Sequence, residues 1–242
     1  MASNTIKIEN KGNTKMVAHR GASGLERENT CAAFVAAGNR SYFGIECDIY
    51  RTIDGKFIVF HDSKTTRIGI DTLEIKETTY ETLRSLKLTD LNGERCRNDL
   101  RIADLDEYLS ICKHYEKKAV LELKSGFCQD SINDVIDIIE KYDYLDNTIF
   151  ISFCFEQLEM IRNARPNTTV QFLINDFADD LIDRLTGSKM DLDIYHKSLT
   201  EENIKLCHEN GIKVNCWTVD DPERAATLIS WGVDYITSNI LE

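Results

Sequence analysis

The stretch KVNCWTVDDPERAATLISWGVDYIT, residues 213–237, contains one complete repeat of the fold. Two apolar strand patterns, Lys213–Thr218 and Asp234–Thr237, flank a segment with helical signals. Pro222 stands in the first turn of that helix and Gly232 just past its end, where helices favour these two residues. The stretch therefore predicts a strand–helix–strand unit.

The same alternation extends toward the N-terminus. Apolar strand patterns occur at Lys15–His19, Phe43–Ile49, Ala119–Leu123, Ile149–Phe153, Val170–Ile174, Leu192–Tyr195, Lys213–Thr218 and Asp234–Thr237. Helical patterns lie between them, for example Thr30 to Ala37, closing on Gly38, and DSINDVIDIIEKY with apolar residues at i, i+3, i+4 and i+7. Eight such repeats in 242 residues predict an α/β fold, a (β/α)₈ TIM barrel. The alternative is a doubly wound open sheet, which is weakened because no G-x-G-x-x-G turn follows the first strand.

One segment interrupts the alternation. Asp54-Gly55 separates two strand-like runs, so we expect a hairpin in which Phe57–Phe60 returns antiparallel to the second strand. The polar stretch at about 63–100 contains one short helical pattern near Thr79–Leu86. We interpret it as a small insertion after the second barrel strand, an inserted subdomain within a single domain spanning 1–242.

Composition excludes several classes of function. Forty-one acidic side chains against 29 basic ones give a net charge of −12, which argues against nucleic acid as a partner and against stable membrane association. A small anionic substrate held by local cations stays possible. The polar first fifteen residues predict no signal peptide, and no apolar run is long enough for a transmembrane helix. None of the eight cysteines forms a C-x-x-C pair, so we expect reduced, packed thiols and a cytoplasmic protein.

Carboxylates are spaced by two residues at the end of a predicted strand. Glu46 and Asp48 therefore point to one face, which in a barrel is the lumen, and Glu122 ends the next barrel strand in the same way. Either motif alone also fits a solvated strand end or a surface ion pair. Together, three carboxylates at the mouth of a barrel suit a hard divalent cation, Mg²⁺ or Ca²⁺.

Two histidines, His19 and His61, follow apolar runs and should emerge near the same end of the barrel. Beside a metal site they suit the roles of general acid and base. Arg20 in the following loop could bind phosphate, although loop arginines are usually solvated. Trp217 either packs in the core or forms a wall for the organic part of a ligand. His114, His196 and His208 we expect to be structural.

These residues resemble the glycerophosphodiester phosphodiesterase family. The opening motif is His19-Arg20-Gly21-Ala22-Ser23-Gly24, with Glu28-Asn29-Thr30. It continues with Gly44-Ile45-Glu46-Cys47-Asp48, Val59-Phe60-His61-Asp62 and Arg67, and the later blocks are Leu121-Glu122-Leu123-Lys124, Ser152-Phe153, Trp217-Thr218-Val219 and Gly232-Val233-Asp234-Tyr235-Ile236-Thr237. Each block is weak alone, but their joint order and spacing are specific, and they cover nearly the whole chain.

The resemblance implies a role for each matching residue. Glu46, Asp48 and Glu122 are implied as ligands of one divalent cation, and His19 and His61 as the acid–base pair. Arg20 and Lys124 are implied as phosphate contacts, and Trp217 and Phe153 as lining for the alcohol side of the substrate. The family fold is a TIM barrel with a small insertion after the second strand, in agreement with the pattern of strands.

Three positions depart from the family pattern. Arg27 and Ala103 each stand where the family usually has proline, and Thr237-Ser238-Asn239 lacks the usual Thr-Asp and the following proline. None of these changes removes an implied ligand or histidine. We therefore expect them to affect loop geometry and the preference for a leaving group more than activity.

The expected activity is metal-dependent hydrolysis of a small-molecule glycerophosphodiester to glycerol 3-phosphate and an alcohol. The alternatives are a phospholipase-like enzyme acting on intact lipid headgroups, with Ile68, Ile70, Leu73 and Ile75 as an apolar rim, and a non-catalytic binding barrel. The sequence leaves open the alcohol, the choice of cation, the division of labour between the histidines, the attacking nucleophile and the oligomeric state.

Overall fold

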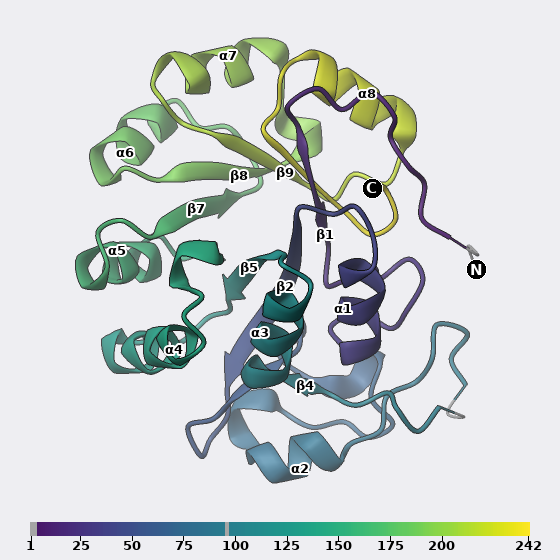
Figure 1. Ribbon diagram of the computed structural model, residues 1–242. Coiled ribbons are helices and arrows are strands. Elements are labelled where there is room, and N and C mark those ends of the chain that lie inside the picture. The colour runs from purple at the N-terminus through teal and green to yellow at the C-terminus, as the bar shows by residue number, and fades with distance from the viewer. Residues whose placement is uncertain (1–3, 95–96) are drawn as a thin grey trace.

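Eight parallel strands form the centre of the computed structural model, which describes residues 4–94 and 97–242 (Figure 1). They are Lys15–Ala18 (β1), Gly44–Arg51 (β2), Lys118–Leu123 (β5), Thr148–Ser152 (β6), Thr169–Ile174 (β7), Asp191–Tyr195 (β8), Val214–Trp217 (β9) and Tyr235–Ser238 (β10). They follow this order around the molecule, and the ring closes because β1 pairs with both β10 and β2. The predicted TIM barrel is confirmed, and an open sheet is wrong.

Helices surround the barrel (Figure 1). They are Cys31–Gly38 (α1), Leu105–His114 (α3), Gln129–Lys141 (α4), Phe155–Ala164 (α5), Leu181–Ser188 (α6), Glu201–Glu209 (α7) and Pro222–Ser230 (α8), with 3₁₀ turns at Leu145–Asn147 (η3) and His196–Ser198 (η4). In α4 the predicted apolar positions Ile132, Val135, Ile136 and Ile139 are all buried. The helices therefore cover the sheet with the faces that the apolar periodicity predicts.

The end of α1 differs by one residue from the prediction. Gly38 is the last helical residue and Asn39 is the cap, with its backbone N–H donating to the carbonyls of Val35 and Ala37. Gly38 is needed for packing rather than for a turn, because a Cβ atom there would lie 2.4 Å from the ring of Tyr115.

The barrel interior is apolar in one part and polar in another. Val17, Val120 and Ile149 belong to a buried apolar cluster inside the ring. Toward the carboxyl ends of the strands the interior becomes polar: Glu46 is the register partner of Val120, and Glu122 lies two residues further along β5, both buried. This end of a TIM barrel is where binding and catalytic groups gather, so the fold brings the predicted site residues to the expected place.

An additional antiparallel layer follows β2. The expected hairpin is present: Phe57–Val59 (β3) pairs antiparallel with β2. A two-residue strand, Ala103–Asp104 (β4), pairs with β3 and was not predicted, because two residues carry no periodicity. Between them lie two 3₁₀ turns, Thr65–Arg67 (η1) and Ile75–Glu77 (η2), and one short helix, Tyr80–Ser85 (α2).

The apolar residues of this segment face inward. Ile68 and Ile75 are buried in a cluster with Phe60 and Leu83, and Ile70 and Leu73 pack partly buried against it. The expectation that these four aliphatic side chains form an exposed apolar rim is therefore wrong, because they supply the core on which the segment folds.

The prediction of packed thiols is confirmed for four cysteines and wrong for Cys128, which is exposed. Cys47, Cys112, Cys207 and Cys216 are buried, and all seven cysteines in the described residues are unpaired. Cys96 lies outside the described residues. Within 4–94 and 97–242, no helix combines the length and the apolar character that crossing a bilayer requires.

Candidate active site

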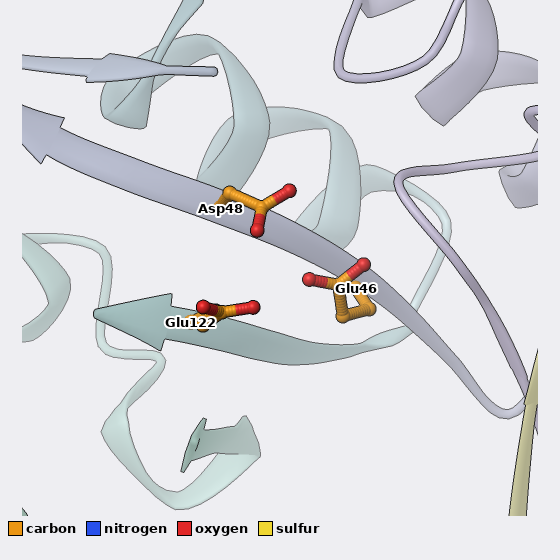
Figure 2. Close-up of side chains that lie close together, drawn as sticks. All are labelled: Glu46, Asp48 and Glu122. Atoms are coloured by element: carbon orange, nitrogen blue, oxygen red, sulfur yellow. The ribbon is translucent and has the colours of Figure 1, made fainter. Parts of the chain in front are cut away.

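Three carboxylates meet at the carboxyl ends of two neighbouring strands. Glu46 and Asp48 project from β2 and Glu122 from β5, where Asp48 and Glu122 are register partners. One oxygen from each lies within 4.8 Å of the others, and all three residues are buried. Figure 2 shows the three side chains turned toward a common space. The alternation of the strands therefore produces the predicted carboxylate cluster.

Burial and mutual repulsion raise the proton affinity of two of these carboxylates. Burial, and then the charges of Asp48 and Glu122, raise the pKa of Glu46 well above its usual range. Burial and the charge of Asp48 raise the pKa of Glu122 to about 8. Burial would also raise the pKa of Asp48, but the charges of Lys124 and Arg20 hold it well below its usual range. The positive charge that the protein places beside Glu46 and Glu122 is thus too small to keep the pKa values of these two carboxylates in their usual range.

The raised pKa values of Glu46 and Glu122 indicate whether these residues fit a metal ion. Oxygen donors with unscreened negative charge, close enough to share one ligand, are what Mg²⁺ and Ca²⁺ bind. A divalent cation would take the place of the protons that Glu46 and Glu122 otherwise hold. The donor set therefore fits a hard divalent cation.

Lys124 contacts two carboxylates of the cluster. Its Nζ donates to Glu122 Oε1 at 2.7 Å and to Asp48 Oδ1 at 3.2 Å. On the other side of Asp48, the Asn29 side-chain amide donates to Oδ2 at 2.8 Å. Asp48 is thus held from two directions, and the ammonium group of Lys124 stands at the edge of the cluster.

Arg20 contacts the acidic cluster with its backbone and its side chain. It adopts a left-handed backbone conformation, with φ of 54°, and its N–H donates to Glu46 Oε2 at 2.7 Å. The guanidinium donates to Glu28 at 2.8 Å, and Nε lies 3.5 Å from Asp48 Oδ2. The guanidinium is therefore fixed beside the site, not solvated as a loop arginine usually is.

His19 is oriented by an amide. Its Nδ1 lies 2.8 Å from Oδ1 of Asn239. The amide of Asn239 is itself oriented, because its Nδ2 donates to Asp220 at 2.6 Å and its Oδ1 accepts from the Ser23 hydroxyl at 2.7 Å. Oδ1 can only accept, so Nδ1 of His19 carries the hydrogen and Nε2 is left with its lone pair. Burial and the charge of Arg20 lower the pKa of His19 to about 4.

His61 is oriented by a carboxylate. Its Nδ1 lies 2.7 Å from Asp62 Oδ1, and Asp62 Oδ2 accepts from Arg67 Nε at 2.7 Å. Arg67 also donates two parallel hydrogen bonds of 2.7 Å to Glu28, which in turn accepts from Arg20. A chain of charge-assisted bonds therefore joins the two residues that flank the site, His61 and Arg20.

A cavity of about 210 Å³ connects these groups. Its lining includes both histidines, Glu46, Glu122 and Arg20, together with Phe153 and Trp217. The rings of Phe153 and Trp217 meet edge to face at 5.7 Å, and Phe153 is 48% exposed at the mouth. A larger groove of about 570 Å³ lies beside α3 and α4, but neither the histidines nor the carboxylate cluster lines it.

Several residues of the site were not assigned roles from the sequence. Glu28, Asn29, Asp62 and Arg67 lie within the motifs, and their contacts depend on side-chain directions that spacing does not give. Asp193 on β8 also lines the cavity. The period-two argument applied to Glu46 and Asp48 would have placed Asp193 in the lumen as well.

The three departures from the family pattern have different surroundings. Arg27 Nε donates to the Thr89 carbonyl at 2.6 Å, and Ala103 pairs with Val59 in the additional layer. Asn239 contacts His19 directly. The expectation that all three concern loop geometry and the preference for a leaving group more than activity stays a prediction. Away from the cavity, His208 Nε2 lies 2.8 Å from Asp234 Oδ2, and His114 packs against Tyr115.

Comparisons with known proteins identify the family of this chain. The chain is 28% identical over 232 residues to a glycerophosphodiester phosphodiesterase of Caldanaerobacter subterraneus subsp. tengcongensis, covering 93% of this chain and 94% of the relative. The crystal structure of a glycerophosphodiester phosphodiesterase from Parabacteroides distasonis matches with a TM-score of 0.80 at 27% identity, covering 95% and 94% of the two chains. An Oleispira antarctica phosphodiesterase, solved with the product sn-glycerol-3-phosphate, matches with a TM-score of 0.86 at 23% identity, covering 93% of each chain. The model of the glycerophosphoryl diester phosphodiesterase family matches residues 19–241, and the chain belongs to this family.

Proposed function

We propose that the protein hydrolyses glycerophosphodiesters to glycerol 3-phosphate and an alcohol, with one divalent cation held by Glu46, Asp48 and Glu122. The observation that carries this proposal is the meeting of two oriented histidines, a carboxylate cluster and Arg20 at one cavity. The family to which the chain belongs supports the class of substrate. The product bound in the Oleispira antarctica phosphodiesterase is the one proposed here.

The bound cation, Mg²⁺ or Ca²⁺, would neutralise charge on the phosphate and lower the pKa of a coordinated hydroxyl or water. Arg20 and Lys124 supply the protein's own positive charge at the same place. Each is anchored by carboxylates, Arg20 by Glu28 and Lys124 by Glu122, so its donors are already oriented before the substrate arrives. The cation, Arg20 and Lys124 would therefore place positive charge beside the phosphate inside a negatively charged protein.

The two histidines perform the proton transfers. In both rings Nδ1 is occupied by a side-chain partner, so Nε2 is the atom that faces the reaction. His19 faces a neutral amide and Arg20, which favours its neutral form and the role of base. Burial lowers the pKa of His61, but the Asp62 carboxylate opposes this shift by stabilising the positively charged ring, whereas His19 has only a neutral amide. Of the two histidines, His61 is therefore better suited to the role of acid.

His19 accepts the proton of the attacking hydroxyl, either water or the 2-hydroxyl of the glycerol, as a new phosphorus–oxygen bond forms. The phosphorus–oxygen bond to the alcohol breaks, and His61 gives its proton to the departing oxygen. Attack by water gives glycerol 3-phosphate directly. Attack by the 2-hydroxyl gives a cyclic phosphate, which water opens in a second step, with His61 accepting the proton of the water and His19 returning its proton to the 2-oxygen. Phe153, exposed at the mouth, lines the alcohol side of the cavity together with the ring of Trp217, whose buried indole N–H has no partner among the described residues and is left free for the glycerol side.

The structure gives no support to the lipid-headgroup alternative, because the residues expected to form its apolar rim are buried or pack inward. The non-catalytic alternative would have been favoured by a missing ligand or histidine, and each of these residues is present in the site. Hydrolysis of a soluble diester is therefore the function that the geometry supports best.

Phosphorus NMR of glycerophosphocholine incubated with metal-stripped full-length protein tests the proposal. Addition of Mg²⁺ or Ca²⁺ should produce glycerol 3-phosphate and choline, and a chelator should stop the reaction. The variant Glu122→Gln should lose this activity. The matched control Asp191→Asn should keep it. Release of phosphocholine, or cleavage of phosphatidylcholine vesicles without cleavage of glycerophosphocholine, would overturn the proposal.

A further inference from the structure

Asp193, on β8, is a buried carboxyl group without a partner, and burial raises its pKa well above the usual range. The residue is 1% exposed, it lines the cavity, and its Oδ1 is buried without any hydrogen-bond partner among the described residues. A buried acceptor that gives up water without gaining a donor destabilises the fold. Such a group calls for an explanation, and a ligand in the cavity is a direct one.

The neighbouring polar side chains donate no hydrogen bond to Asp193 among the described residues. Asn215 on β9 donates to Gln171 on β7 at 3.1 Å, and Thr237 on β10 donates to Asn215 at 3.1 Å. Gln171 Nε2 is also buried without a partner among the described residues, but Gln171 does not line the cavity and no bond from it reaches Asp193. Trp217, which also lines the cavity, has a buried indole N–H that donates to no acceptor in the described part of the chain. An unpartnered acceptor and an unpartnered donor in the lining of one cavity are the complement of a hydroxyl group, which both donates and accepts.

The strand order places Asp193 opposite the carboxylate cluster. In the closed ring β8 is four strands from β2 in either direction, so the two strands face each other across the lumen. Among the described residues, Asp193 is not one of the carboxylates whose oxygens gather within 4.8 Å. It is therefore separate from the proposed cation site, on the far wall of the same cavity.

We propose that Asp193 accepts a hydrogen bond from the terminal hydroxyl of the substrate's glycerol moiety and is a specificity-determining residue for glycerol. This inference rests on the proposed function, which places the phosphate beside β2 and β5. A glycerol moiety that extends from there across the cavity brings its terminal hydroxyl, the group farthest from phosphorus, to β8. The indole N–H of Trp217 donates to a hydroxyl oxygen of the same moiety.

A pair of substrates separates this contact from the chemistry. Glycerophosphocholine is compared with 2-hydroxypropyl phosphocholine, which lacks only the terminal hydroxyl and keeps the 2-hydroxyl and the choline. The wild type should prefer glycerophosphocholine by about 10- to 100-fold in kcat/KM, because a site built for a hydroxyl disfavours the analogue without it. In Asp193→Ala this preference should fall to within about threefold, mainly through KM, with little change for the analogue.

Further variants keep the result interpretable. Asp193→Leu fills the volume without an acceptor and should behave like Asp193→Ala, whereas Asp193→Asn keeps an acceptor and should retain part of the preference. Asp191→Asn, two residues earlier on β8, changes a carboxylate that bonds the backbone of Lys213 outside the cavity, and should keep the full preference. Circular dichroism and thermal melting identify any variant that does not fold.

The outcomes are distinct. Wild-type preference in a folded Asp193→Ala or Asp193→Leu variant, or no preference in the wild type, would overturn the inference and leave the proposed function intact. The same two substrates can be made with a neutral alcohol in place of choline. If Asp193→Ala changes the preference for the choline esters but not for the neutral esters, the inference is also overturned, because Asp193 would then recognise the cationic alcohol. Failure of the wild type to cleave either substrate would overturn the proposed function, and the inference with it.

Discussion

Nδ1 of His19 lies 2.8 Å from Oδ1 of Asn239, although the two residues are 220 positions apart in the chain. The carboxylate of Asp220 accepts from the side-chain amide of Asn239 at 2.6 Å and from its backbone N–H at 2.8 Å. His19 therefore faces a neutral amide, and the negative charge stands one residue further back. A carboxylate in direct contact would stabilise the imidazolium more strongly, so this order of residues favours a neutral His19.

Exchanging these two side chains should move the pH profile. The double variant Asp220→Asn with Asn239→Asp keeps a hydrogen bond between them but places the carboxylate against His19. The pKa of His19, lowered to about 4 in the native arrangement, should rise by about 1–2 pH units. Because a base acts in its neutral form, the acidic limb of kcat/KM against pH should move upward by the same amount. An acidic limb that stays in place in the folded variant contradicts the assigned contact.

Asp62 should act on the rate through His61. Asp62→Asn removes the carboxylate that accepts at Nδ1, so the imidazolium is less stable and kcat should fall by about 10- to 100-fold with little change in KM. Steady-state kinetics measure both constants. Lys64→Ala is the control: it breaks an exposed pair with Glu74 in the same segment, and such pairs contribute little. Equal effects of the two variants would count against a positioning role.

Cation binding should release protons. Without a cation the pKa of Glu122 is about 8 and that of Glu46 lies well above its usual range, so at pH 7 the cluster holds protons that a cation displaces. The affinity for Mg²⁺ or Ca²⁺ should therefore increase as the pH rises from 6 to 8. Calorimetric titration in two buffers of different ionisation enthalpy measures the protons released. An affinity that is flat over this range, with no release, would show that the carboxylates are already ionised.

Removing a cluster charge should stabilise the metal-free protein. The folded-state pKa of Glu46 is raised, so its ionisation opposes folding; this cost is absent below the ordinary pKa and grows as the pH rises. Glu46→Gln should raise the melting temperature of metal-free protein at pH 8, by about 2–4 °C for each kcal/mol gained, and have little effect near pH 4.5. Added cation should no longer stabilise this variant. The exposed Glu140→Gln serves as control, and a lower melting temperature for Glu46→Gln at pH 8 would refute the argument.

Much of the site could be predicted because it follows from strand periodicity. Glu46 and Asp48 alternate with buried residues on one strand, and Glu122 stands at the equivalent position of the neighbouring strand, so the closed barrel alone brings them together. The hairpin after β2 could be predicted for a similar reason, since Asp54-Gly55 is a local turn signal. That residues 63–100 form a subdomain inserted into one domain spanning 1–242 stays a prediction.

The unpredicted parts depend on side-chain direction and on distant partners. Asn239 reaches His19 from the other end of the chain, and Arg67 joins Asp62 to Glu28 by donors that fork in two directions. The aliphatic residues around Ile68 looked available for a lipid surface, because short turns such as η1 and η2 have no periodicity that tells an inward face from an outward one. Local patterns therefore identify which residues reach the site, and tertiary contacts decide how each is oriented.

The central claim is that His19 and His61 share the proton transfers, and the leaving group tests it most directly. Glycerol 3-phosphate esters of choline and of p-nitrophenol differ in their need for an acid, because p-nitrophenolate departs without a proton. Turnover of both esters is measured for the wild type and for the His19→Ala and His61→Ala variants, each shown to be folded and to bind the cation.

His61→Ala should lose about 10²- to 10⁴-fold in kcat on the choline ester and stay within about tenfold of the wild type on the p-nitrophenyl ester. His19→Ala should lose activity on both esters, because the base is needed whatever the leaving group. Substantial turnover of the choline ester by either variant would contradict the account.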